Sequence, residues 1–118
     1  MKRDLVLFLD DILINIQDIE SFSKDISKEN FKTDKLKQNA IIRSLEVIGE
    51  AAKNIPNNFR EKYPEIPWKK ISGFRDVLIH EYFGIKISRI WNVIEKDLPD
   101  LREKLLKIKE DLEMNSKK

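Results

Sequence analysis

Apolar residues recur every three or four positions along most of this chain, and this spacing constrains its fold more than any other feature. Such a repeat places apolar side chains on one face of an α-helix, and no segment shows the sustained alternation of a β-strand. A first helix is therefore expected from about Asp4 to Phe22. Its buried stripe is expected to contain Leu5, Leu9, Ile12, Ile16 and Ile19.

A second helix is expected after a connecting turn at residues 27–31. Thr33 or Asp34 can cap its N-terminus, and the helical pattern continues to about Asn54. Its expected apolar positions are Leu36, Ala40, Leu45, Ile48 and Ala52. Gly49 lies inside this helix at a cost of roughly 1 kcal/mol relative to alanine, which indicates close approach by a neighbouring helix.

A third helix is expected beyond an irregular middle that is interrupted by prolines and cannot sustain a long helix. These prolines are Pro56, Pro64 and Pro67. Because Pro67 suits a first helical turn, the third helix is expected to run from about Trp68 to about His80. Gly84 is expected to close this unit.

Two more helices complete an expected bundle of about five. The fourth is defined by Ile87, Ile90, Trp91 and Ile94. Pro99 can open the fifth, and the chain is expected to fray from Asn115 to Lys118. The apolar face of the fifth helix is expected to contain Leu101, Leu105, Ile108 and Leu112. A chain of 118 residues is too short for two cores, so residues 1–118 are expected to form one all-α domain.

The composition excludes several classes of protein. The chain has no cysteine, which removes disulfides, thiolate zinc sites and cysteine nucleophiles. Charged residues make up 37% of it but leave a net charge of +2, which neither indicates nor excludes a nucleic-acid partner. No secretory segment and no run of roughly 20 apolar residues is present, so we expect a soluble, cytoplasmic protein without a membrane partner.

Motifs for metal and cofactor chemistry are also missing. His80 is the sole histidine, so one chain cannot supply a two-histidine metal site. The three glycines are far apart, and the chain has neither a phosphate-binding loop nor a Gly-x-Ser-x-Gly elbow. No spacing among the 21 acidic residues selects a magnesium site. We therefore expect no metal and no cofactor.

Residues 73–84 combine three functional side chains between two glycines: Arg75, His80 and Tyr82. Arginine offers planar, bidentate hydrogen bonds to phosphate oxygens and stays charged. Histidine exchanges a proton near neutral pH. Together they suffice for cleaving RNA without a metal, because the imidazole can move the proton of the ribose 2′-hydroxyl or of the leaving 5′-oxygen while the guanidinium stabilises charge on the phosphate.

Helix geometry restricts how this pair can act. Five helical residues turn the chain so that Arg75 and His80 lie about 140° apart. Either the helix breaks near His80, or the arginine bends round, or a second subunit completes the site. We favour the second subunit, because a two-fold axis places two such segments around one cleft.

A purely structural interpretation of the same residues is also open. A lone histidine near a helix end is commonly a capping or packing residue, and Arg75 can pair with Asp76 or Glu81 at the surface. Tyr82 can belong to the core. Trp68 and Trp91 are expected to be core or dimer-interface anchors rather than platforms for bases, and Glu50 is expected to be a surface carboxylate rather than a part of the site. Candidate RNA contacts at the rim of the cleft are Lys69, Lys70, Lys86 and Arg89.

The spacing Arg75-x4-His80-x-Tyr82 resembles the R-x4-H-x-Y motif of HEPN-domain ribonucleases, specifically the HepT toxin family. Three further segments, at residues 48–52, 64–68 and 91–101, resemble the family pattern in the expected order. The resemblance extends from about Asp4 to Leu112.

The resemblance implies a HEPN-type helical bundle that forms a two-fold homodimer, with motif segments of both subunits facing a shared cleft. It implies that Arg75 and His80 are the catalytic pair of a metal-independent ribonuclease acting on transfer RNA or messenger RNA. Asp76 falls where the family commonly has a polar residue, often asparagine, and would orient the site.

The resemblance also implies a role as the toxin of a type VII toxin–antitoxin pair. The partner would be an MntA-like minimal nucleotidyltransferase that transfers AMP groups from ATP onto Tyr82. Such AMPylation adds bulk and negative charge where RNA phosphates bind, so it should block the substrate. The alternative is a non-catalytic HEPN dimer that holds a nucleotidyltransferase and binds nucleotide or RNA without cutting it. A third alternative is a structural helical dimer with no small-molecule site.

Overall fold

The computed structural model describes residues 2–80 and 86–116, and every regular element among them is a helix. The all-α prediction is therefore confirmed. The molecule is elongated, with principal extents of 50 × 29 × 21 Å. None of the helices in these two segments is long and apolar enough to cross a membrane.

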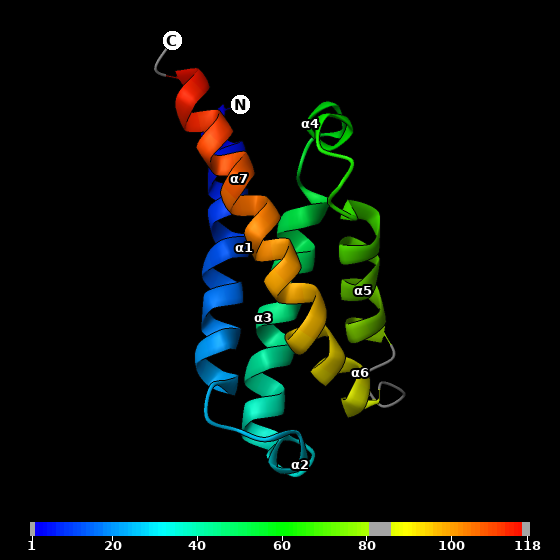
Figure 1. Cartoon of the computed structure of the whole chain (residues 1–118). Coiled ribbons are helices and arrows are strands. Elements are labelled where there is room, and N and C mark those ends of the chain that lie inside the picture. The colour runs from blue at the N-terminus through cyan, green and yellow to red at the C-terminus, as the bar shows by residue number, and fades with distance from the viewer. Residues whose placement is uncertain (1, 81–85, 117–118) are drawn as a thin grey trace.

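The elements follow one another as α1 (Lys2–Ser23), α2 (Lys28–Phe31), α3 (Lys35–Lys53), α4 (Asn57–Lys62), α5 (Trp68–His80), α6 (Ile87–Asn92), the π-helix η2 (Val93–Asp97) and α7 (Leu98–Ser116). The long helices run alternately up and down, and α3 contacts both α1 and α5 (Figure 1). α7 crosses in front of α1 and α3, while the short helices α2 and α4 lie at opposite ends of the bundle (Figure 1).

The boundaries expected for the first three long helices are correct to within two residues. Two short helices were not expected: α2 occupies the predicted turn at residues 27–31, and α4 lies in the proline-rich middle. α2 forms because Ser27 caps it, accepting a hydrogen bond from the Asn30 N–H at 3.1 Å. Its last residue, Phe31, is fully buried against Trp91, with ring centroids 5.2 Å apart.

The core lies where the predicted stripes meet. Four of the five stripe residues of α1 are buried, and Leu5 packs against them from a partly buried position. Trp68 and Trp91 are also buried, at 5% and 8% exposure, so they are core residues. Leu36 is a wrong prediction, since it is 81% exposed. It lies nine residues before the buried Leu45, or about 180° around the helix, and so cannot share its face.

Both ends of α3 are fixed by side chains. The carboxylate of Asp34 accepts a hydrogen bond from the Lys37 N–H at 3.0 Å, which confirms one of the two expected caps. At the other end, the Arg60 guanidinium of α4 donates to three backbone carbonyls at 2.6–3.0 Å. These belong to Ala52, Lys53 and Ile55. A cation at the carbonyl end of a helix complements both its unpaired acceptors and its dipole.

The expected fourth and fifth helices form one continuous rod through η2, not two separate helices. Pro99 explains the π-turn, because in a regular α-helix its ring would clash with the carbonyl of the residue four positions earlier. The wider π-turn, in which the Leu98 N–H donates to the Val93 carbonyl, relieves this conflict. α7 then continues to Ser116, beyond the expected start of fraying at Asn115.

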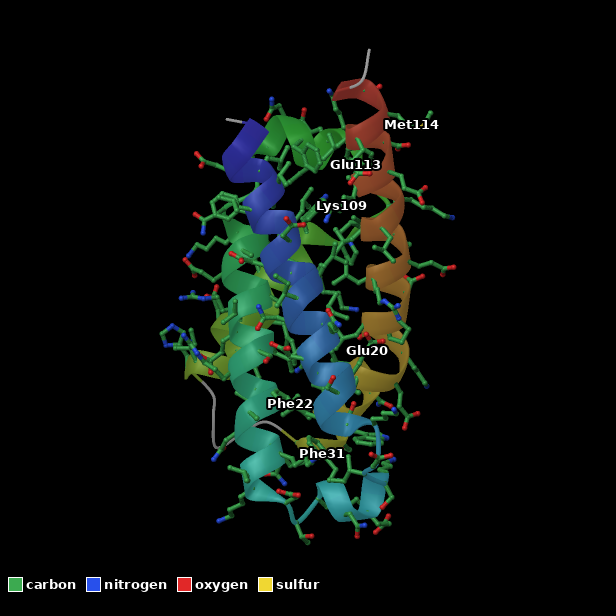
Figure 2. The ribbon with its side chains drawn as sticks, turned by 90° about the vertical axis from the view of Figure 1, so that its left-hand side faces the viewer. Glu20, Phe22, Phe31, Lys109, Glu113 and Met114 are labelled. Atoms are coloured by element: carbon green, nitrogen blue, oxygen red, sulfur yellow. The ribbon has the colours of Figure 1, made fainter. Side chains whose placement is uncertain are left out.

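Ion pairs join α7 to α1 along their length. Lys109 contacts Asp10 at 2.9 Å, and Arg102 contacts Glu20 at 3.1 Å. Figure 2 shows Lys109 and Glu20 at two levels of the seam between these helices. The hydrogen bond with Asp10 raises the pKa of Lys109 against the opposing effect of burial.

Candidate active site

Gly49 allows α5 to approach α3 at the position of Arg75. A Cβ atom built on Gly49 would lie 2.3 Å from the Arg75 Cβ and 3.3 Å from its Cα. The close approach predicted for Gly49 is therefore confirmed, and the residue on the other side is the arginine of the motif. The backbone of α3 thus fixes where the Arg75 side chain leaves α5.

Two carboxylates hold the Arg75 guanidinium. Its Nε lies 2.8 Å from Oε2 of Glu50, and its Nη1 lies 3.3 Å from Oδ1 of Asp76. The pairing with Asp76 that the structural interpretation allowed is present. Glu50 is an exposed carboxylate, as expected, but it also pairs with Arg75, which was not expected. The Arg75 side chain is 25% exposed, so it remains partly accessible from solvent.

The Arg75 side chain lies beside a shallow cavity of about 220 Å³ between α1, α3 and α5. Its walls also carry Arg43 and Glu46, which pair with each other at 3.6 Å. Exposed apolar side chains occur on the same helices: Leu7, Ile14 and Ile79 are 52%, 54% and 41% exposed. Charged side chains therefore line the cavity, and exposed apolar side chains lie on α1 and α5 beside it.

His80 is separated from Arg75 within the chain. α5 is helical from Trp68 through His80, so the helix does not break before the histidine. The guanidinium extends toward Glu50, and the two side chains are not joined by any hydrogen bond or ion pair among the described contacts. His80 is exposed. Tyr82 and Gly84 lie outside the described residues.

The four basic residues expected at an RNA cleft divide into two groups. Lys70 and Arg89 line one cavity of about 410 Å³, formed by α3, α5, α6, η2 and α7. Lys69 and Lys86 are exposed but do not line it. In the two described segments, no three His, Cys, Asp or Glu side chains gather into an arrangement that could hold a metal ion.

These features define a class: an all-helical protein in which one helix presents a carboxylate-anchored arginine and an exposed histidine five residues further on. In a comparison with known families, residues 12–108 match the model of the "Ribonuclease HepT-like" family. The chain belongs to this family. No solved structure matches it.

Several curated relatives are also similar. "Putative RNase MJ0125" of Methanocaldococcus jannaschii is 47% identical over 112 residues, covering 95% of this chain and 97% of the relative. "Probable ribonuclease HepT" of Thermococcus cleftensis is 46% identical, covering 92% and 99%. "Gamma-glutamylcyclotransferase and putative RNase MJ0434" of M. jannaschii is 47% identical across 98% of this chain, which spans only 52% of that longer relative.

Sequence reasoning missed two parts of this arrangement. The contact between Glu50 and Arg75 joins residues 25 positions apart. Gly49 indicated that another helix approaches α3 closely, but it did not indicate which residue makes the contact. The cavity at Lys70 and Arg89 depends on how α6, η2 and α7 pack over α5, and no local pattern predicts that packing.

Proposed function

We propose that this chain is a metal-independent endoribonuclease in which Arg75 and His80 carry out the reaction. The observation that carries the proposal is the anchored guanidinium. Glu50 holds Nε at 2.8 Å while the Arg75 side chain stays 25% exposed, so a phosphate can approach the guanidinium from solvent. Family membership and the relatives named as ribonucleases support the same conclusion.

The chemistry follows from what the two side chains can do. The imidazole of His80 accepts the proton of a ribose 2′-hydroxyl, whose oxygen attacks the neighbouring phosphorus. The bond from phosphorus to the 5′-oxygen breaks, leaving a 2′,3′-cyclic phosphate, and the 5′-oxygen takes up a proton from an imidazolium. Arg75 stabilises the charge that grows on the phosphate oxygens during this step.

Two copies of the chain complete the site in this proposal. α5 is continuous between Arg75 and His80, which leaves their side chains about 140° apart on one helix. A two-fold axis beside α5 would bring the arginine of one protomer toward the histidine of its partner. The exposed Leu7, Ile14 and Ile79 supply apolar surface on α1 and α5 that such a dimer would cover.

The biological role we propose is that of a toxin acting on transfer RNA or messenger RNA. A cognate MntA-like nucleotidyltransferase would neutralise it by AMPylation of Tyr82. Co-expression with such a partner should add multiples of an AMP unit to the intact mass, and Tyr82→Phe should abolish the addition. Growth arrest by the unmodified chain and its relief by the partner would support this role; unmodified protein that is harmless to the cell would contradict it.

Cleavage of RNA by the purified protein tests the enzymatic proposal. In the presence of EDTA, Arg75→Ala should lose nearly all activity, and Glu50→Gln should lose part of it because Arg75 is no longer fixed. Arg43→Ala is the matched control, since it removes an arginine that lines the same cavity and pairs with Glu46. Equal activity of Arg75→Ala and Arg43→Ala, with both folded, would contradict the role of Arg75.

A second candidate function is a non-catalytic dimer that binds a nucleotidyltransferase and nucleotide or RNA. One observation favours it: Arg75 already has carboxylate partners on both sides, Glu50 and Asp76, which compete with a phosphate. This candidate predicts RNA binding without cleavage. Asp76→Asn separates the two, because removing that charge should raise cleavage by an enzyme and should leave a pure binder inactive.

A further inference from the structure

The 410 Å³ cavity between α3, α5 and the α6–η2–α7 rod has an apolar floor and a charged rim. The floor is formed by Leu45, Ile48, Ile71, Phe74, Val93, Leu98 and Leu101. Polar side chains at its edge include Lys70, Arg89, Asn92 and Asp97. This combination of apolar walls and a few polar groups is typical of a site for a small, flat ligand group.

Two charged side chains at the rim of this cavity are available to contact a ligand. Lys70 and Asp97 both line it, yet neither takes part in an ion pair with any residue of the described segments. The Arg89 guanidinium lies over the Phe74 ring, 5.1 Å from its centroid. Arginine guanidinium planes and aromatic rings are both surfaces on which nucleobases stack.

Gly73, at the edge of the same cavity, has no explanation in the fold. It lies inside α5, where glycine is a poor helix former, and its backbone does not adopt a positive φ. A Cβ atom added there would meet nothing within 4 Å, in contrast to Gly49. Open space above a helical backbone is what a ligand strand needs in order to pass close to it.

Gly73 also connects the cavity to the candidate active site. It precedes His80 by seven residues, or about two helical turns, so the two positions share a face of α5. They are separated by about 10 Å along the helix axis. A short stretch of extended strand along this face would therefore join the cavity to the histidine.

We propose that the cavity receives one unpaired base of the RNA substrate and that the strand runs from it over Gly73 to His80. The base would stack on Phe74 and Arg89, the Asn92 amide would hydrogen-bond its edge, and Lys70 would contact the adjacent phosphate. This inference rests on the proposed function for the identity of the substrate. It makes the substrate single-stranded at this point, because a paired base cannot enter the cavity.

Binding, measured separately from cleavage, tests the inference. The probe is a single-stranded 2′-O-methyl RNA oligonucleotide containing 2-aminopurine, which cannot be cut through its 2′-oxygens and whose fluorescence falls on stacking. Gly73→Gln fills the open path with a good helix former whose Cβ meets nothing within 4 Å, so thermal stability should not fall. Phe74→Leu removes the stacking ring and keeps an apolar side chain. Lys107→Ala, at an exposed position of α7 outside the cavity, is the control for Lys70→Ala.

We expect Phe74→Leu to weaken binding by about 5- to 100-fold and to abolish the fluorescence change. Gly73→Gln should also weaken binding, and Lys70→Ala should weaken it more than Lys107→Ala does. Full-strength binding by folded Gly73→Gln, or a preference for duplex RNA, would overturn the inference. If the cavity variants lose binding while the unaltered protein never cuts RNA, the cavity stands and the proposed nuclease function fails.

Discussion

Exchanging each of two glycines for alanine tests how α5 is held against α3. The Gly49→Ala variant places a Cβ 2.3 Å from the Arg75 Cβ, whereas carbon atoms in contact prefer about 3.5–4.0 Å. The helices must separate by roughly 1 Å or more, because the obstructing atom is next to the backbone and cannot rotate away. Gly73→Ala creates no such contact, since nothing lies within 4 Å of the new atom.

The magnitude follows from comparing the two variants. Both replace a helical glycine with alanine and so gain about 1 kcal/mol in helix propensity. Gly49→Ala alone bears the cost of overpacking, about 1–3 kcal/mol. Gly73→Ala should therefore be more stable than Gly49→Ala by about 1–3 kcal/mol, which corresponds to roughly 4–12 °C in Tm for a chain of this size.

Urea unfolding followed by circular dichroism, at fixed protein concentration, measures this difference. The concentration must be held constant because association would add to the apparent stability. Gly73→Ala should unfold at a higher urea concentration than the unaltered protein, and Gly49→Ala at a lower concentration than Gly73→Ala. If Gly49→Ala proves as stable as Gly73→Ala, the close contact between Arg75 and α3 is not what positions α5.

Two further predictions concern side chains that tie the bundle together. Arg60→Ala removes the guanidinium that caps α3 and should lower the free energy of unfolding by about 1–3 kcal/mol. Arg43→Ala, at an exposed position, should change it by less than about 0.5 kcal/mol. If urea unfolding shows similar losses for the two variants, Arg60 does not cap α3. Folding raises the pKa of Lys109 above its ordinary value of 10.5 through the hydrogen bond with Asp10, so this stabilisation is present below that pH and is lost as the pH rises through the folded value. The stability gap between the unaltered protein and Lys109→Met should therefore narrow above about pH 10.5, and a gap that stays constant to pH 11.5 would refute this linkage.

The helices themselves were predictable because their determinants are local. The apolar spacing of α1, the Asp34 cap and the start of α5 after Pro67 each depend on a few neighbouring residues. The predictions were wrong where burial or helix continuation depends on tertiary packing. Leu36 matched an apolar pattern but lies on the opposite side of α3 from Leu45. The sequence predicts a helix start at Pro99, but a π-turn allows the helix to continue through it.

The sequence singles out the candidate residues of the site but does not predict their geometry. The arginine and histidine stood out because they occur together in a short segment with the sole histidine of the chain. Their separation by about 140° was expected from helix geometry, and the continuous α5 keeps it. The role of Glu50 depends on which face of α3 meets α5, and this packing joins residues that are 25 positions apart in the sequence.

Cleavage of a single-stranded RNA in EDTA by the purified protein and by its His80→Ala variant tests the central claim most directly, provided that both have the same oligomeric state. We predict that the unaltered protein leaves 2′,3′-cyclic phosphate ends, stops cutting where the 2′-hydroxyl is replaced by hydrogen, and loses about 10²–10⁴-fold in rate without the imidazole. A folded His80→Ala variant that cuts RNA at the unaltered rate would contradict it.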